Sequence, residues 1–155
     1  MFDHFDIIAP FYDRVIHKLD LNRLTDLLKL PTRGRMLDAG GGTGRVSSRL
    51  RSLIDEIVVC DLSLSMLKQA KNKGRLLTVQ TYAEKLPFPN ESFDFVLCWG
   101  EMTEAVKELI RVIKKGGKLS IFLTNRFREA IDLFPKDPKA AIALAELHSD
   151  YINHG

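Results

Sequence analysis

A run of glycines behind an aspartate is the part of this sequence best suited to hold a ligand. Residues 36–44 read Met-Leu-Asp-Ala-Gly-Gly-Gly-Thr-Gly, which places Gly40, Gly42 and Gly44 shortly after Asp38. Glycines let a backbone turn sharply and approach a ligand closely, and the amides at the start of a following helix favour a negative group. The loop therefore suits a nucleotide-like ligand. The alternative is a loop that only connects a strand to a helix.

The charge of Asp38 selects among nucleotide ligands. A carboxylate at the end of a strand repels the pyrophosphate of NAD or FAD, whereas it attracts the sulfonium and ammonium groups of S-adenosylmethionine (SAM). The dinucleotide pattern GxGxxG also fails, because its last position is Arg45 when the count starts at Gly40. It is Ser47 when the count starts at Gly42. We therefore expect SAM as the cofactor and S-adenosylhomocysteine as its product.

Asp61 is a second acid in a position that suits a nucleoside. It ends the apolar run 57–60 and stands 17 residues beyond Gly44. In Rossmann-like domains an acid at the end of the second strand accepts hydrogen bonds from ribose hydroxyls. An aspartate at a strand end can also cap a helix, and the glycine loop nearby favours the ribose.

Strands and helices alternate around these residues. Apolar runs predict strands at 34–39, 57–60, 76–81, 93–99 and 118–123. Apolar stripes and capping residues predict helices at 11–30, 45–52, 63–72, 103–115, 127–133 and 140–151. Pro87 and Pro89 predict a loop between the third and fourth strands. Such alternation implies an α/β fold with a parallel sheet and right-handed crossovers.

Composition narrows the class of protein further. The 155 residues fit one globular domain, and a net charge of +3 is too small to indicate nucleic acid as a partner. No apolar run is long enough to predict a membrane span. Cys60 and Cys98 lack the spacing of a metal site, so we expect no metal, a reducing compartment and a cytoplasmic protein.

The ordered set of motifs resembles the class I SAM-dependent methyltransferases, in particular the ubiquinone/menaquinone-biosynthesis-like (methyltransferase type 11) group of small-molecule methyltransferases. The resemblance runs from about Phe5 to Leu123. The motifs that carry it are FDIIA with YD at 5–13, LDAGGGTG at 37–44, VCDLS with ML at 59–67, AEKLPFP at 83–89, SFD at 92–94 and RVIKKGG at 111–117. The resemblance implies transfer of a methyl group to a small-molecule acceptor.

The resemblance also implies a set of cofactor-binding residues, namely Asp38, Gly40, Gly42, Gly44, Asp61, Leu62, Met66, Ala83 and Glu84. The first four are expected around the methionine end of SAM, Asp61 at the ribose and the others at the adenine. Ordinary helix packing is the alternative for Leu62 and Met66. Similar proteins carry an Asp before the alanine, and this chain has Tyr82, so Glu84 or Tyr82 is expected to replace that acid.

Methyl transfer mainly requires that the acceptor and the methyl group be aligned and that water be excluded. A general base is optional, and the sequence assigns no catalytic residue. The candidates are Tyr12, on a helix that similar enzymes close over the cofactor, and Glu101, which follows the fourth strand. The alternative for Tyr12 is a packing aromatic.

The expected architecture is a Rossmann-like sheet of about five strands in the order 3-2-1-4-5. One domain, 1–155, is expected to comprise a helical lid (1–30), a core (34–124) and a helical tail (125–155). No C-terminal antiparallel hairpin is predicted after Leu123, so the fifth strand is an expected edge through which a homodimer could form. The alternatives in function are a non-catalytic SAM-binding or scaffold protein and, less favoured, an NAD-dependent oxidoreductase.

Overall fold

The structure is a computed structural model that describes residues 33–99 and 105–122, together with residues 9, 10, 13, 28 and 30. All of these lie in the first of the two units into which the chain divides, Met1–Phe122. The predicted division into a lid, a core and a tail stays a prediction, because the tail and most of the lid lie outside the described residues.

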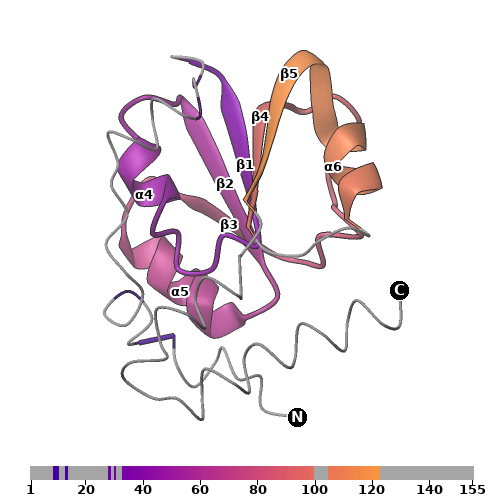
Figure 1. Ribbon diagram of the computed structural model, residues 1–155. Helices are drawn as coiled ribbons and strands as arrows, with labels where there is room; N and C mark the ends of the chain where they lie inside the picture. The colour runs from indigo at the N-terminus through magenta and orange to yellow at the C-terminus, as the bar shows by residue number, and fades with distance from the viewer. Residues whose placement is uncertain are drawn as a thin grey trace, which may run out of the picture. The chain divides into compact units, whose positions relative to one another are not determined.

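The described residues form one sheet of five parallel strands in the order β3-β2-β1-β4-β5 (Figure 1). The strands are β1 (Arg35–Ala39), β2 (Glu56–Asp61), β3 (Leu77–Gln80), β4 (Phe93–Trp99) and β5 (Ile113–Phe122). Residues of β1 pair with β2 on one side and with β4 on the other, so the strand order reverses between β1 and β4. The predicted Rossmann-like fold and its strand order are confirmed.

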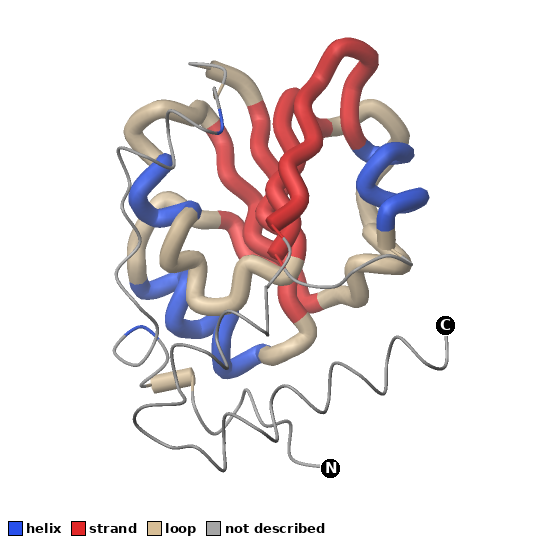
Figure 2. Tube along the Cα trace, viewed as in Figure 1, coloured by secondary structure: helices blue, strands red, loops and turns tan. Residues whose placement is uncertain are grey.

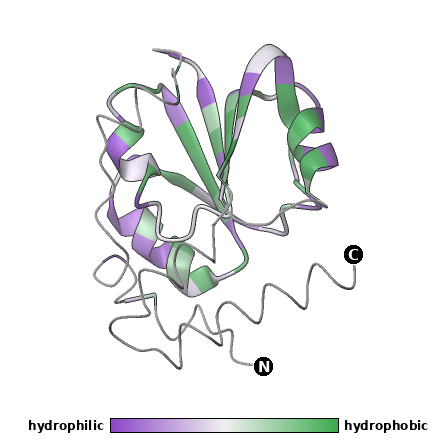
Figure 3. Cartoon of the chain, in the orientation of Figure 1, coloured by the Kyte–Doolittle hydropathy of each residue, from purple (hydrophilic) through white to green (hydrophobic). Residues whose placement is uncertain are grey.

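Helices cover both faces of this sheet. Helices α4 (Ser47–Leu50) and α5 (Leu64–Asn72) lie on one side and α6 (Val106–Val112) on the other (Figure 1). Successive strand residues point to opposite faces, so a strand covered on both faces is apolar along its length. The hydrophobic colour along the middle strands in Figure 3 reflects this burial.

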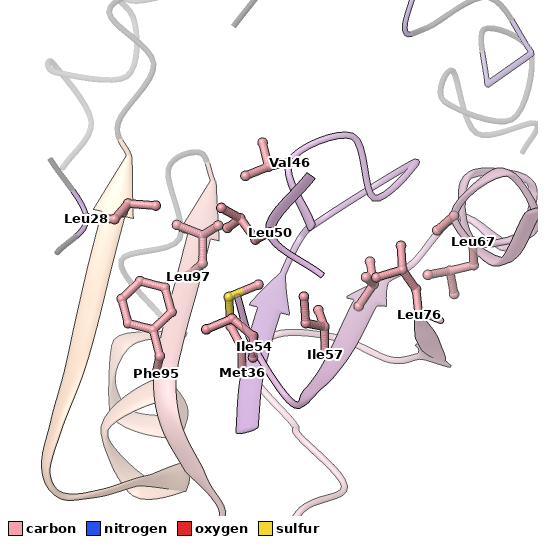
Figure 4. Packing of buried hydrophobic residues seen from close by; sticks show 12 residues of the cluster. Leu28, Met36, Val46, Leu50, Ile54, Ile57, Leu67, Leu76, Phe95 and Leu97 are labelled. Carbon is pink, nitrogen blue, oxygen red and sulfur yellow. The ribbon is translucent and has the colours of Figure 1, made fainter. Parts of the chain in front are cut away.

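Two hydrophobic clusters fill the space between the sheet and its helices. The cluster on the α4 and α5 side, shown in Figure 4, consists of Leu28, Met36, Val46, Leu50, Ile54, Ile57, Val59, Leu67, Ala70, Leu76, Phe95 and Leu97. The cluster on the α6 side consists of Leu37, Ala39, Val58, Cys60, Leu86, Phe93, Val96, Cys98, Ala105, Leu109 and Val112. Both clusters run across the central strands, so the core fixes where those strands end.

The loop between β3 and β4 contains no helix among the described residues, as predicted, and α6 holds it in place. The Arg111 guanidinium donates to the carbonyl oxygens of Phe88 at 2.7 Å and Leu86 at 3.0 Å. Glu108 accepts from the Leu86 amide at 2.9 Å and from Arg111 Nε at 2.7 Å. The Arg111 side chain holds the pKa of Glu108 at about 2, so this carboxylate stays charged near neutral pH.

Helix α6 ends earlier than its sequence pattern predicts. The predicted helix 103–115 ends at Val112, and β5 begins at Ile113 rather than at 118. Ile113 pairs with Phe93 across the sheet, and the amide of Ser92 donates to the Val112 carbonyl at 2.7 Å. These contacts with β4 outweigh the apolar spacing that continues the helical pattern. None of the helices in the described residues is long and apolar enough to cross a membrane.

Two glycines with similar backbone angles allow packing to be separated from backbone strain. Gly44 has a φ of 64°, and a Cβ there would lie 2.8 Å from Leu76 Cδ1 and 3.0 Å from Ala70 Cβ. Gly116 has a φ of 77°, and a Cβ there would meet no atom of the described residues within 4 Å. Both Ala substitutions carry the left-handed backbone penalty of about 1–2 kcal/mol. We expect Gly44→Ala to lower the free energy of unfolding by about 1–3 kcal/mol more than Gly116→Ala does.

Urea titrations of the two variants measure this difference. Equal losses of stability would contradict the close packing of Gly44 against Ala70 of α5 and Leu76, which precedes β3.

Candidate functional site

The two aspartates singled out by the sequence meet at one edge of the sheet. Asp38 pairs in register with Val59 of β2, and Ala39 pairs with Cys60, so Asp61 follows directly at the end of β2. The carboxyl ends of parallel strands share one edge, and the loop between β1 and α4 leaves the sheet there (Figure 2). This edge includes the reversal of strand order between β1 and β4, which is where open α/β sheets bind ligands.

Asp38 is fully buried beneath the glycine loop. Its exposed fraction is 0%, and a Cβ on Gly41 would lie only 2.6 Å from Asp38 Cγ. Asp38 Oδ2 accepts a hydrogen bond of 2.5 Å from Ser47 Oγ at the start of α4. Its neighbours in register, Val59 and Leu97, are buried and apolar. No side chain at residue 41 could therefore be accommodated without moving the carboxylate.

Burial changes the acidity of Asp38. Desolvation raises its pKa to about 7, the hydrogen bond from Ser47 opposes this, and the negative charge of Asp61 adds to it. The sequence predicts a fixed negative charge at this position. In the structure the carboxyl group is near its titration midpoint at neutral pH, so its charge depends on pH and on what binds nearby.

The amides of the glycine loop tie the loop to the end of β2. The Gly42 amide donates to Asp61 Oδ2 at 2.9 Å, and the Gly41 amide donates to the Cys60 carbonyl at 3.1 Å. The Gly44 amide donates to the Gly41 carbonyl at 2.9 Å. These three amides are therefore engaged within the protein rather than open to an anion.

Asp61 contacts the backbone on both sides of the edge. Besides the Gly42 amide, it accepts the amide of Ser63 on Oδ1 at 2.9 Å. The cap of α5 is Ser63, whose Oγ accepts from the Met66 amide at 3.1 Å. Asp61 is half-buried. A carboxylate has about four lone-pair sites, so its oxygens can accept from a ligand hydroxyl as well as from backbone amides.

Two buried polar atoms without a hydrogen-bond partner among the described residues lie at this same edge. They are Asp38 Oδ1, near the end of β1, and Trp99 Nε1, at the end of β4. The Trp99 ring stacks on Phe122 of β5 with centroids 4.4 Å apart. Buried polar atoms are nearly always paired, so an unpaired acceptor and an unpaired donor on adjacent strands are unusual, and both lie at the edge where open α/β sheets bind ligands.

The residues expected around adenine differ in their exposure to solvent. The Thr81 amide donates to the Asp61 carbonyl at 3.1 Å, which sets the chain after β3 beside the end of β2. Leu62 is 45% exposed and Tyr82 is 62% exposed. Met66 is only 2% exposed, so it packs inside the protein as the helix-packing alternative states.

Ala83 is half-buried and Glu84 is exposed. Their contacts with adenine stay predictions. The candidate catalytic residues Tyr12 and Glu101 lie outside the described residues.

The two cysteines and possible metal ligands add no chemistry to this edge. Burial raises the pKa of Cys60 to about 12 and that of Cys98 to about 11, and nearby acids add to both shifts. Neither cysteine forms a disulfide, and both thiols stay protonated at neutral pH. Among the described residues no group of three His, Cys, Asp or Glu side chains could hold a metal ion.

Comparison with known proteins decides the family. Residues 37–121 match the methyltransferase domain family. The chain belongs to this family. The matched segment contains the glycine loop, both aspartates and all five described strands except the ends of β1 and β5. The resemblance to class I SAM-dependent methyltransferases, with SAM as the cofactor of the family, is confirmed.

Individual methyltransferase relatives show how far the likeness extends. The chain is 35% identical to the ubiquinone/menaquinone biosynthesis C-methyltransferase UbiE of Pseudomonas aeruginosa (strain LESB58), over 76% of this chain and 52% of that protein. It therefore spans about half the length of the curated relatives it matches. A putative methyltransferase from Bacillus halodurans C-125 is 31% identical, with a TM-score of 0.60, over 66% of this chain and 49% of that one.

The same fold also carries other chemistry. The [4+2]-cyclase SpnF is 25% identical and has a TM-score of 0.64, over 76% of this chain and 57% of that chain. The fold alone therefore does not specify methyl transfer.

The raised pKa of Asp38 has a measurable consequence for stability. The native state keeps a proton that the unfolded chain releases near pH 3.8. The stabilising contribution of this proton is therefore fully present below that pH and is lost as the pH rises through about 7. We expect the wild type to lose more stability than Asp38→Asn between about pH 5 and about pH 8. Urea titrations at both pH values test this, and parallel losses would show that Asp38 titrates normally.

Proposed function

We propose that this chain binds SAM at the carboxyl ends of β1 and β2 and transfers its methyl group to a small-molecule acceptor. The observation that carries the proposal is a pair of buried polar atoms, Asp38 Oδ1 and Trp99 Nε1, that have no partner in the described part of the chain and lie at the reversal of strand order. Membership of the methyltransferase domain family supports the same cofactor.

The charges at this edge suit a cationic ligand. Burial is the main reason that the pKa of Asp38 is raised, and the negative charge of Asp61 raises it further. The two carboxylates therefore destabilise one another when both are ionised. A ligand that carries positive charge stabilises both, whereas a pyrophosphate adds a third negative group. This favours SAM over NAD, and it disfavours the oxidoreductase alternative.

The described residues also leave room for a ligand beside Asp61. Among them, a Cβ on Gly42 would meet only Asp61 Oδ2, at 3.9 Å. Asp38, Gly40 and Gly42 would hold the methionine end, and Asp61 would accept the ribose hydroxyls. Exposed Leu62 would contact the adenine.

When bound, SAM supplies a methyl group on an already activated sulfonium carbon. The chain therefore has to fix orientation and exclude water, and such alignment lowers a barrier by up to about 7–11 kcal/mol in favourable cases. Trp99 Nε1 is a donor at the end of β4 that could orient an acceptor oxygen. Tyr12 and Glu101 remain candidate groups for the acceptor side.

We propose a quinone-type ring as the first acceptor to test, because UbiE of Pseudomonas aeruginosa is named a ubiquinone/menaquinone biosynthesis C-methyltransferase. The second candidate function is SAM binding without methyl transfer, as in a scaffold protein. The similarity to the [4+2]-cyclase SpnF supports this second candidate function, since that chain shares the fold and is named for a reaction other than methyl transfer.

Calorimetry with SAM, S-adenosylhomocysteine and NAD tests the binding site directly. We expect micromolar binding of both sulfur ligands and none of NAD. Asp61→Ala removes a charged hydrogen-bond acceptor, so it should lower the affinity for SAM by about 10- to 100-fold. Glu56→Ala is the matched control, because Glu56 is an exposed acid at the opposite end of β2.

If calorimetry detects no heat of binding with SAM or with S-adenosylhomocysteine, the proposed function is contradicted. Binding of SAM without turnover across a panel of quinone-type and small-metabolite acceptors would favour the second candidate function.

The predicted homodimer and the cytoplasmic location stay predictions. In the described sheet β5 pairs with β4 alone. The exposed Lys114, Lys115 and Lys118 stand on β5, and charges of this kind oppose edge-to-edge pairing. Sedimentation equilibrium tests the dimer. Dissociation by Ile121→Glu would support pairing through β5, and a monomer at the highest soluble concentration would contradict it.

A further inference from the structure

We propose that Asp13 and Lys73 act as positioning residues for the cofactor site by fastening Thr43, and with it the glycine loop, in the conformation that binds SAM. The proposal rests on the proposed function. It adds two residues, 60 positions apart in the sequence, that lie outside the set expected to touch the cofactor.

The composition of the loop explains why such a fastening is needed. Between residues 40 and 44 the chain has four glycines and one residue with a side chain, Thr43. Glycine loses more conformational freedom on ordering than any other residue. Thr43 is therefore the one position in this stretch at which a side chain can hold the loop. It is 1% exposed, so its polar atoms need partners within the protein.

The hydroxyl and the carbonyl oxygen of Thr43 are both engaged by the proposed pair. Its hydroxyl donates to Asp13 Oδ1 at 2.6 Å, and its carbonyl oxygen accepts from Lys73 Nζ at 2.7 Å. Lys73 Nζ also donates to Asp13 Oδ2, which closes a three-residue ring of hydrogen bonds. Asp13 comes from the N-terminal segment and Lys73 is the C-cap residue of α5. The ring thus joins three separate parts of the chain at the loop.

The charges of this ring are balanced. Burial tends to raise the pKa of Asp13, but hydrogen bonds from Lys73 and Thr43 and the positive charges of Lys73 and Arg45 outweigh it and lower the pKa. Asp13 therefore remains an anion at neutral pH. The Lys73 and Asp13 side chains are 25% and 36% exposed, so the ion pair is weakened by solvent and its effect should be moderate.

The ring acts on the segment that also carries the cofactor contacts. Thr43 directly follows Gly42, whose amide is bonded to Asp61. Holding the loop before the ligand arrives reduces the ordering cost of binding. Loss of the hydrogen bonds to Thr43 should therefore lower the affinity for SAM even when the fold is intact.

The test is a set of paired variants whose SAM affinity is measured by calorimetry at a temperature where each is fully folded. Thr43→Val removes the hydroxyl and Thr43→Ser keeps it, while Lys73→Met removes the charge and Lys73→Arg keeps it. Asp13→Ala removes the acceptor. Lys71→Met is the matched control, because Lys71 is an exposed lysine on the last turn of the same helix.

We expect the affinity for SAM to fall by about three- to fivefold in each of the variants Asp13→Ala, Thr43→Val and Lys73→Met, which is the range of a partly exposed ion pair. The Thr43→Ser, Lys73→Arg and Lys71→Met variants should bind like the wild type. The double variant of Asp13→Ala and Thr43→Val should bind SAM no more weakly than either single variant, because both substitutions remove the same hydrogen bond. Additive losses, or unchanged affinity in the single variants, would overturn the proposal while leaving SAM binding intact.

A second readout does not require a ligand. Hydrogen exchange of the amides at 40–46 should be faster in Asp13→Ala than in the wild type or in Lys71→Met. If the wild type fails to bind SAM, the proposed function is wrong, and this measurement still decides whether the ring holds the loop. Unchanged exchange in Asp13→Ala would show that it does not.

Discussion

The burial of one carboxylate determines how this site is built. Asp38 has no exposed surface, and its Oδ1 atom lacks a partner among the described residues. An unsatisfied buried polar atom costs about 1–3 kcal/mol, so an apolar residue at this position would give a more stable sheet. The chain instead keeps an acid where the strand order reverses. Local choices that work against stability are concentrated at functional sites, and we attribute this one to ligand binding.

The shape of the glycine loop follows from that carboxylate. Gly41 lies directly over Asp38, where a Cβ would be only 2.6 Å from Asp38 Cγ. Ser47 fixes the side of the carboxylate that faces α4. Asp61 holds the amide of Gly42, and the ring around Thr43 holds the far side of the loop. The acid, the loop and the ends of β1 and β2 therefore form one unit whose parts restrain each other.

The sequence predicted those features that depend on local pattern. The central strands were predicted because burial on both faces makes them continuously apolar, and the helix at 63–72 was predicted because a capping residue precedes an amphipathic stretch. The end of α6 was not, because Ile113 continues the helical spacing and its pairing with Phe93 joins residues 20 positions apart. The hydrogen bond from Ser47 to Asp38 was also missed, because it joins residues nine positions apart that no local pattern relates.

Longer-range contacts were beyond any pattern in the sequence. The contact between Asp13 and Thr43 spans 30 residues, and no periodicity signals it. The burial of Asp38, which moves its pKa to about 7, likewise depends on packing by β2 and β4, whose residues lie about 20 and 60 positions further along the chain.

The most direct test of the central claim is the titration of the Asp38 carboxyl carbon by 13C NMR, with Asp38→Asn to assign the resonance. The account predicts a midpoint of about 7 in the free protein. It predicts a lower midpoint with SAM and a smaller decrease with S-adenosylhomocysteine, which lacks the sulfonium charge. A midpoint that neither ligand changes would show that the positive charge of SAM does not lie near Asp38, and would contradict the account.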